Sequence, residues 1–471
     1  MAMGHRSGEQ QQDLFVPTAQ LPKSIGHVFY RKLNELLAEA KFDRWVENLC
    51  ETHYAKKKGR PGVPPGVYFR MLLVGYFEGI QSQRGIAWRC ADSLSLREFL
   101  GVPLTKDSPD HSSLSYIRER LPEEVHSAVF EWVLKLAVEK QLLKGKTVAV
   151  DSSTLEANAA MKSIVRRDTG EEWRDYVARL MKEEGVVAPD HTPTDEEVRN
   201  YDKKRKDKKV SNEEWVSETD PAARIARMKD GTTHLAYKAE NVVDLDSSLI
   251  MAAEVYDGDR ADVATLEDSL HAAQTNQREA GSDVVITDVA ADKGYHSAET
   301  LGTIAEETPY RTYIPEPKRK RKGHRKGPHR GNRKPPAQRK ALLANRRRMK
   351  GDRGKRLQRL RSEKVERTFA HLLETGGARR TWLRGIEKVR KRYSLAAAAH
   401  NLGVLMRALF GIGTPRSLQQ FRLDLEAALS LAQLACIRVW NRCFVFWPGR
   451  VIVSRAHRPS WPPGRGAALA C

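Results

Sequence analysis

Cysteine is scarce in this chain of 471 residues, and the few cysteines follow no metal-binding or disulfide pattern. No two of them stand in a C-x-x-C pair, and their number is odd. Such a set forms neither a disulfide framework nor a structural zinc site, and it is typical of a reducing compartment. The cysteines are Cys50, Cys90, Cys436, Cys443 and Cys471.

Long apolar runs are also missing. The most apolar stretches, residues 395–409 and 425–435, are shorter than the roughly 20 residues that a bilayer-spanning helix needs, or they carry charge. Residues 1–12 are polar and lack the apolar segment of a secretory signal. We therefore expect a cytoplasmic protein without a membrane partner.

Acids are outnumbered by basic residues, and the formal net charge is +21. A charge of this size favours a polyanionic partner, and nucleic acid is the candidate that remains once a membrane is set aside. Aromatic residues make up only 7% of the chain and form no cluster that would stack RNA bases. Double-stranded DNA is therefore the favoured partner.

Almost all of the excess positive charge lies in one basic tract, residues 318–361. It contains 21 Lys or Arg residues and a single acid, Asp352. The first half is rich in Gly, Pro and His, which predicts an extended segment. The second half, from about residue 338, lacks proline and is compatible with a helix. The rest of the chain is close to neutral.

The pattern of apolar residues divides the chain into four regions. Residues 1–20 show no pattern and are expected to be disordered. Residues 21–145 show the i, i+3, i+4 spacing of helices, with Asp110 as a candidate N-cap; a DNA-binding domain and a plain helical bundle with surface arginines both fit. Residues 146–415 mix strands with helices, which predicts an α/β core. Residues 416–471 are expected to be a tail that is partly helical or disordered.

Within the α/β region, short β-branched runs predict strands, and amphipathic runs predict helices. A charged, mostly helical insert, about residues 156–230, separates the first strand from a hairpin whose turn lies at residues 244–248. Strands are expected at 146–151, 234–243, 249–255, 284–291 and 311–314, and helices at 262–280, 360–373 and 394–410.

Two acids follow buried strands, where a carboxylate is costly unless its charge is used. Asp151 ends the run KTVAVD, and Asp292 ends VITDVAAD. If the two strands are neighbours, the carboxylates converge, and oxygen-only ligands suit Mg²⁺ or Mn²⁺. Other interpretations remain open. Asp151 can cap a helix, and Asp292 can begin a turn in which Gly294 has a positive φ. Asp288 is a second candidate in the same strand.

A third carboxylate is usually required where two metal ions act together. Glu366 lies in the predicted helix RSEKVERTFAH, where Val365 and Phe369, four residues apart, would face the core. Glu363 is a close alternative for this third carboxylate. For each of the two glutamates, the simpler interpretation is an acid on the solvated face of the helix. Two strand-end acids, a helix acid and a basic tract together favour phosphodiester chemistry, in which paired cations activate a water or a 3′-hydroxyl.

Several ordered blocks carry a family resemblance. They are PPGVYFRMLLVGYFEGIQSQRGIAWR, DSPDHSSLSYIRERL, KTVAVDSSTLEANA, MKDGTTHLAYKAENVVDLDSSLI, ADKGYHS and the V-E-x-x-F pattern of RSEKVERTFAH. Together they resemble the transposase DDE domain proteins of bacterial insertion sequences, over about residues 25–415. The resemblance implies an RNase H-like, retroviral-integrase-like core. It also implies an acidic triad of Asp151, Asp292 and Glu366 that holds two Mg²⁺ or Mn²⁺ ions.

The same resemblance implies cut-and-paste transposition. The protein would bind the terminal inverted repeats of its element as a homodimer, hydrolyse the phosphodiester at each end, and join the freed 3′-hydroxyl to target DNA. It would work at the bacterial nucleoid. The chain departs from many relatives in that Arg361 lies one residue out of register with their arginine. Leu372 and Leu373 stand where they have a lysine, and Arg379 or Arg380 would have to substitute for it.

The residues expected to contact DNA are close to the triad or in the basic tract, and they are basic or aromatic. They are Lys293, Tyr295, Arg346, Arg347, Arg348, Arg361, Arg379 and Arg380. Phosphate contacts release counterions and make binding sensitive to salt. For Tyr295, packing in the core is the alternative. Two rival functions stay open: a metal-dependent nuclease of the same fold, and a decayed transposase that is only a basic DNA-binding protein.

Overall fold

The computed structural model describes residues 26–55, 62–205, 211–228, 231–317 and 334–416. The predictions for residues 1–20, for the first half of the basic tract and for the tail lie almost entirely outside these ranges. The chain divides into two compact units, Met1–Pro415 and Arg416–Cys471, and every helix and strand named below belongs to the first unit. Across the described ranges, no helix has both the length and the apolar character needed to cross a bilayer.

The N-terminal part is helical, as predicted. The first two helices are separate, because Lys41 between them adopts a left-handed conformation with a φ of 54°. Asp110 caps the helix that follows it, and its carboxylate accepts a hydrogen bond of 3.1 Å from the backbone N–H of Ser112. The helices are α1 (Val28–Glu39), α2 (Phe42–Cys50), α3 (Pro65–Glu78), α4 (Gln83–Asp92), α5 (Leu94–Leu100), α6 (His111–Arg120) and α7 (Glu123–Glu139).

A mixed sheet organises the rest of the unit, as the α/β prediction requires. β1 lies inside this sheet, pairing antiparallel with β5 on one side and parallel with β7 on the other. β5 also pairs antiparallel with β4 and β6, and β7 pairs parallel with β8. The strands are β1 (Thr147–Glu156), β4 (Arg224–Arg227), β5 (Thr233–Asp244), β6 (Ile250–Asp257), β7 (Asp288–Ala291) and β8 (Arg311–Tyr313).

Two strands differ in length from the predictions by four residues each, and the other three by one or two. β1 continues five residues beyond Asp151, because residues 152–156 remain paired with β5 as far as the pair Glu156↔Ala236. This pairing outweighs the capping tendency of the Ser-Ser-Thr run that follows Asp151. β7 in turn begins only at Asp288, and the two valines predicted to open it are exposed.

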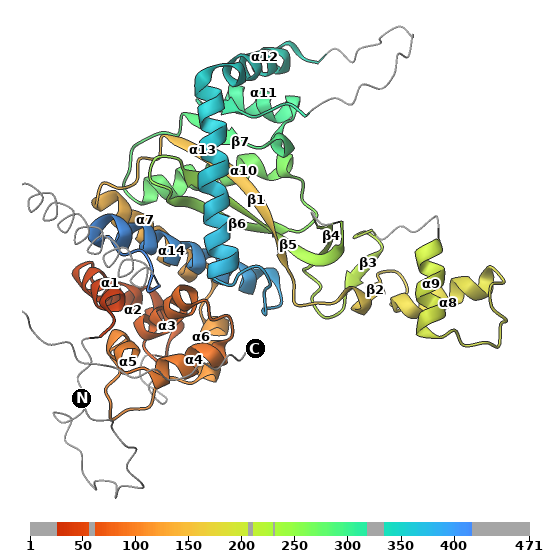
Figure 1. Cartoon of the computed structure of the whole chain (residues 1–471), viewed down its shortest axis with the longest axis horizontal. Coiled ribbons are helices and arrows are strands. Elements are labelled where there is room, and N and C mark those ends of the chain that lie inside the picture. The colour runs from red at the N-terminus through yellow and green to blue at the C-terminus, as the bar shows by residue number, and fades with distance from the viewer. Residues whose placement is uncertain (1–25, 56–61, 206–210, 229–230, 318–333, 417–471) are drawn as a thin grey trace, which may run out of the picture. The chain divides into compact units, whose positions relative to one another are not determined.

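Helices from distant parts of the chain pack on this sheet (Figure 1). α10 (Asp262–Glu279) packs against β5 and β6. α14 (Ile386–Phe410) packs against β6 and also against α7, and so joins the N-terminal helices to the sheet. A single cluster of buried apolar side chains runs from α1 to α14, so the two parts share one hydrophobic core.

The second half of the basic tract is helical. It forms α12 (Pro336–Lys350) and the first part of α13 (Asp352–Phe369). α12 packs against α11 (Ala298–Glu307) and β8, and α13 contacts β1, β5, β7 and β8. Figure 1 shows α13 as a long helix running across the sheet before it continues into the π-helical turn η5 (Ala370–Thr375). The predicted glutamate helix therefore begins earlier than expected.

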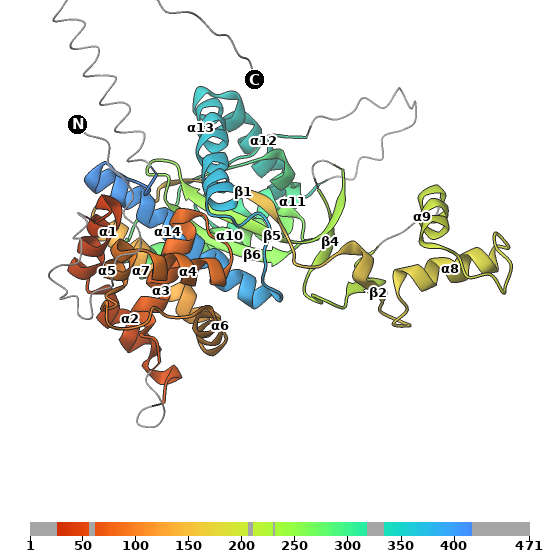
Figure 2. The same cartoon turned by 60° about the horizontal axis from the view of Figure 1, so that its bottom comes forward.

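The insert between β1 and β5 is less helical than predicted. It contains the helices α8 (Trp173–Glu183) and α9 (Asp195–Lys204), and also a ribbon in which β2 (Ile164–Arg166) pairs antiparallel with β3 (Trp215–Ser217). The two helices have a small core of their own, formed by Val177, Met181 and Val198. Figures 1 and 2 both show these helices away from the six-stranded sheet.

Candidate active site

The parallel pairing of β1 and β7 brings two of the predicted acids together. Val150 is paired with Ala291, so the next residue on each strand is Asp151 or Asp292. Neighbouring strands lie about 4.8 Å apart, and the two acids therefore occupy adjacent positions. Asp292 follows the end of β7, as predicted, whereas Asp151 lies within β1. Asp151 is thus not the cap of a helix.

The carboxylate of Asp151 is held by a cation from the helix that crosses the sheet. A guanidinium nitrogen of Arg361, on α13, lies 2.6 Å from Oδ2 of Asp151. Both side chains are largely buried, with 14% and 21% of their surface exposed. Oδ1 of Asp151 also accepts a hydrogen bond of 2.9 Å from the backbone N–H of Ser152. Arg361 was expected to contact DNA, but its charge is directed at the acid.

Asp292 begins a tight turn, η4 (Lys293–Tyr295), and is at the same time beside Asp151. Its Oδ1 accepts a hydrogen bond of 2.5 Å from the backbone N–H of Gly294. Gly294 is not among the described glycines that have a positive φ, so glycine is required here because a larger side chain does not fit. A Cβ atom at this position would lie 2.5 Å from Oδ2 of Asp262 and 2.8 Å from Oδ1 of Asp292.

Asp262, the first residue of α10, is therefore another acid next to the pair, and sequence reasoning missed it. It also accepts a hydrogen bond of 2.9 Å from the hydroxyl of Ser152. Its only sequence signal is its place at the start of a predicted helix, where a carboxylate is common for local reasons.

Asp288 is at the other end of β7 and has a different role. It is buried, and it pairs with Arg311 at 3.1 Å and with Arg353 at 2.6 Å. In the register of the sheet it lies opposite Thr147, three positions from the Val150–Ala291 pair. Asp288 is thus a structural anchor for α13 and β8 and is not part of the acid pair.

Glu366 lies on α13, which contacts both β1 and β7. Val365 and Phe369 are buried, as the helix pattern predicts, while Glu366 is exposed and accepts a hydrogen bond of 2.8 Å from the hydroxyl of Ser362. Its rival Glu363 pairs with Arg367 on the surface. Among the described residues, no three acids, histidines or cysteines are arranged as a ready-made metal site. The structure therefore brings Asp151 and Asp292 together and leaves Glu366 on the crossing helix.

A buried polar network lies behind these acids, and sequence reasoning missed it as well. Lys238 and Glu240, two residues apart on β5, form an ion pair with an N–O distance of 3.1 Å. The hydroxyl of Tyr295 donates a hydrogen bond of 2.9 Å to Glu240, and the ring is fully buried. Burial, followed by the nearby carboxylates, raises the pKa of Tyr295. Tyr295 thus has the core position that was its alternative, and its side chain is not exposed for a DNA contact. The alternation of Lys and Glu within HLAYKAENVV was the signal.

The other predicted DNA-contacting residues fall into three groups. Lys293 and Arg347 are exposed. Arg348 is partly buried, where it donates a hydrogen bond of 2.9 Å to the carbonyl of Thr312, and burial lowers its pKa. The exposed arginines with an acidic partner on the surface are Arg346 with Glu316, Arg379 with Glu374, and Arg380 with Glu156.

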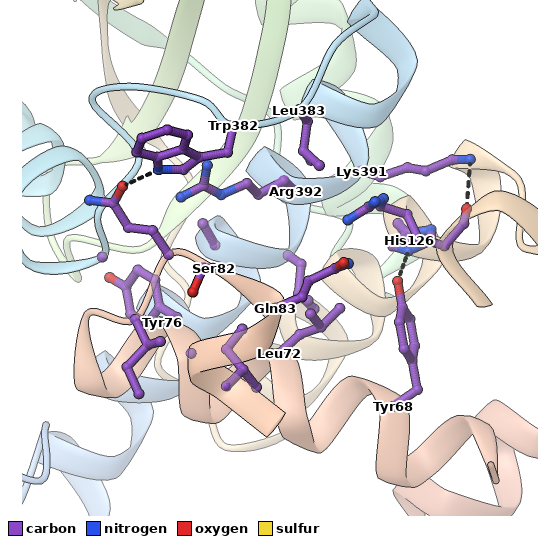
Figure 3. Close-up of a pocket in the computed structure, with 18 residues that line it drawn as sticks. Tyr68, Leu72, Tyr76, Ser82, Gln83, His126, Trp382, Leu383, Lys391 and Arg392 are labelled. Carbon is purple, nitrogen blue, oxygen red and sulfur yellow. Dashed lines mark hydrogen bonds between the residues drawn. The ribbon is translucent and has the colours of Figure 1, made fainter. Parts of the chain in front are cut away.

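A cavity of about 340 Å³ lies apart from these acids, between α3, α4 and α14 (Figure 3). Of the residues that the structure describes, three cations line it, Arg118, Lys391 and Arg392, and no carboxylate does. Burial lowers the pKa of Arg392 to about 10. At its edge the indole N–H of Trp382 donates a hydrogen bond of 2.7 Å to Gln81. None of the predicted site residues lines this cavity.

Comparison with known families finds two matching regions in the chain. Residues 18–120 match the family described as Transposase domain (DUF772). Residues 147–402, more than half of the chain, match the family described as Transposase DDE domain. No curated protein matches the chain. The family resemblance inferred from the sequence blocks is thereby confirmed, and the chain belongs to the transposase DDE domain family, as a transposase of an insertion sequence.

Proposed function

We propose that this transposase binds the terminal inverted repeats of its own element and carries out cut-and-paste transposition. The observation that carries the proposal is the adjacency of Asp151 and Asp292 on neighbouring parallel strands, with the helix bearing Glu366 packed across both strands. Two separate segments of the chain thus supply acids to one place on the sheet, and that is the arrangement a shared metal site requires.

An RNase H-like core is part of this proposal. The central β1 with antiparallel β5 and β6 on one side and parallel β7 and β8 on the other supports it. The helix that carries the third acid follows β8, the last strand within the described ranges, and crosses the sheet at the acid-bearing strands, which supports the same assignment.

Asp151, Asp292 and Glu366 would hold two Mg²⁺ or Mn²⁺ ions. Their carboxylate oxygens are the hard ligands that these cations prefer. Asp151 already binds one positive group, the guanidinium of Arg361, which supports a place for a cation at this carboxylate. When bound, the ions would supply a nucleophile from water or a 3′-hydroxyl and stabilise the leaving oxygen.

The protein's own groups would bind and orient the DNA. Lys293 is exposed directly beside Asp292, where its ammonium would contact a backbone phosphate near the cleaved bond. Arg347 and the other exposed basic residues of α12 and α13 would neutralise further phosphates. We assign recognition of the repeat to the N-terminal helices. Because two ends have to be joined, the acting species would be a homodimer on double-stranded DNA at the nucleoid.

A labelled duplex that carries the terminal sequences flanking the gene tests the proposal. We expect nicking at the repeat boundary that requires Mg²⁺ or Mn²⁺, followed by strand-transfer products, and loss of both in Asp292→Ala. Asp268→Ala is the matched control, because Asp268 is an exposed acid on α10. Cleavage without joining would indicate the nuclease alternative. Selective binding without cleavage would indicate a DNA-binding remnant and would refute catalysis.

A further inference from the structure

The buried network behind the two acids is centred on one ammonium. Nζ of Lys238 lies 2.8 Å from Oδ1 of Asp262 and 3.1 Å from Oε2 of Glu240. It also donates a hydrogen bond of 2.8 Å to the hydroxyl of Thr265, which in turn donates one of 2.7 Å to Glu240. The side chain of Lys238 is 8% exposed, so its charge interacts with these interior groups and does not reach a DNA phosphate.

The carboxylates that Lys238 holds are connected to the two acid-bearing segments. Asp262 accepts the hydroxyl hydrogen bond of Ser152, the residue after Asp151, and its other oxygen lies against Gly294 in the turn that Asp292 begins. Glu240 accepts the hydroxyl hydrogen bond of Tyr295 at the end of the same turn. Two contacts therefore lead from Lys238 to Ser152, the neighbour of Asp151, and two lead to the turn that Asp292 begins.

The charges of the network depend on this one cation. Glu240 is fully buried, and its Oε1 has no hydrogen-bond partner among the described residues. Without the ammonium, the buried carboxylate of Glu240 would lose its counter-charge and lie near the carboxylate of Asp262, whose side chain is 32% exposed. One of the two carboxylates would then move away or take up a proton, because a buried carboxylate beside a second negative charge and without a cation is strongly unfavourable. Either change would displace Ser152 or the turn η4.

We propose that Lys238 is a positioning residue that sets the separation of Asp151 and Asp292 through Asp262 and Glu240. The inference rests on the proposed function, since it concerns how the acids are held for divalent cations. Lys238 itself does not touch the DNA or the reacting phosphate. Its contribution is to fix the positions of Asp151 and Asp292, which lie on two different strands, relative to each other.

Binding of Mn²⁺ to the full-length protein, measured by isothermal titration calorimetry, tests the proposal. Mn²⁺ binding that is lost in Asp292→Ala defines the site. We expect Lys238→Met to weaken this binding at least tenfold, Lys238→Arg to retain most of it, and duplex binding without metal to change less than twofold. Lys391→Met is the matched control, because Lys391 is also a buried, ion-paired lysine but lies on α14.

A milder variant keeps the test valid if Lys238→Met does not fold. Tyr295→Phe removes only the hydroxyl that joins η4 to Glu240, and we expect Mn²⁺ binding to weaken about threefold with an unchanged melting temperature. Wild-type Mn²⁺ affinity in a folded Lys238→Met or Tyr295→Phe protein would overturn the positioning role. An equal loss in Lys391→Met would overturn it too, because a general loss of stability would then explain the effect.

The outcome also separates this inference from the proposed function. A wild-type protein that binds Mn²⁺ and cleaves DNA, with a Lys238→Met variant that does the same, refutes the positioning role alone. A wild-type protein whose Mn²⁺ binding does not depend on Asp292 refutes the metal site, and the positioning role with it.

Discussion

Replacing Arg361 by glutamine should increase the affinity of the acid pair for divalent metal in the absence of DNA. The guanidinium lies 2.6 Å from Asp151, and a metal ion at this carboxylate must displace it. A hydrogen bond to a charged group contributes about 1.5–3 kcal/mol, and every 1.4 kcal/mol corresponds to a factor of about ten. Partial exposure of the pair places the effect at the lower end, so we expect an increase of about tenfold.

Isothermal titration of Mn²⁺ into the two proteins measures this effect. Loss of any positive charge near the site slightly increases its affinity for cations. Arg356 is an exposed arginine on the same helix, so Arg356→Gln is the control for this effect of charge alone. We expect less than a twofold change in that variant. Unchanged or weaker Mn²⁺ binding in Arg361→Gln would refute the competition and would show that Arg361 supports the metal-bound arrangement.

Three further measurements probe other parts of the molecule. Gly294→Ala should reduce metal-dependent cleavage at least tenfold, because the added Cβ would collide with Asp292. Gly351→Ala is the control and should leave cleavage unchanged, because its Cβ would lie 3.5 Å from its nearest neighbour. Equal cleavage by the two variants would contradict the close packing at Gly294. Arg347→Gln should weaken duplex binding and lower the salt dependence by about one unit, which titrations at several salt concentrations would detect; an unchanged slope would exclude a phosphate contact. Burial lowers the pKa of His126 to about 4 from an ordinary value of 6.5. The free energy of unfolding should therefore fall by about 3 kcal/mol as the pH falls from 6.5 to 4. Urea titrations should show that His126→Gln lacks this part of the pH dependence.

The α/β class, the helical N-terminal part and the adjacency of the two strand acids could be predicted from the sequence. Apolar periodicity reports on which residues are buried, and parallel strands place equivalent positions side by side. The length of β1 could not be predicted, since residues 152–156 are held in the strand by their pairing with β5. A local pattern contains no information about such a distant partner.

The functions of individual polar residues were harder to predict. Tyr295 and Lys293 are two residues apart, yet one is buried against Glu240 and the other is exposed, because η4 turns their side chains to different environments. Asp262 approaches Asp292 only through the packing of α10 on the sheet, and no spacing along the chain indicates this contact. The role of Arg361 depends in the same way on where α13 crosses β1.

The pairing of Glu156 with Ala236 closes the insert at its base, because Arg224, where the chain returns to the sheet, pairs with the same residue of β5 from its other side. Residues 157–223 therefore form an excursion whose two ends are held on either side of β5 by strand pairing. Lengthening a closed loop is inexpensive, since each doubling costs only about 0.6 kcal/mol. Evolution or protein engineering can thus enlarge, shorten or replace α8 and α9 while Asp151, five residues before the closing pair, keeps its place beside Asp292.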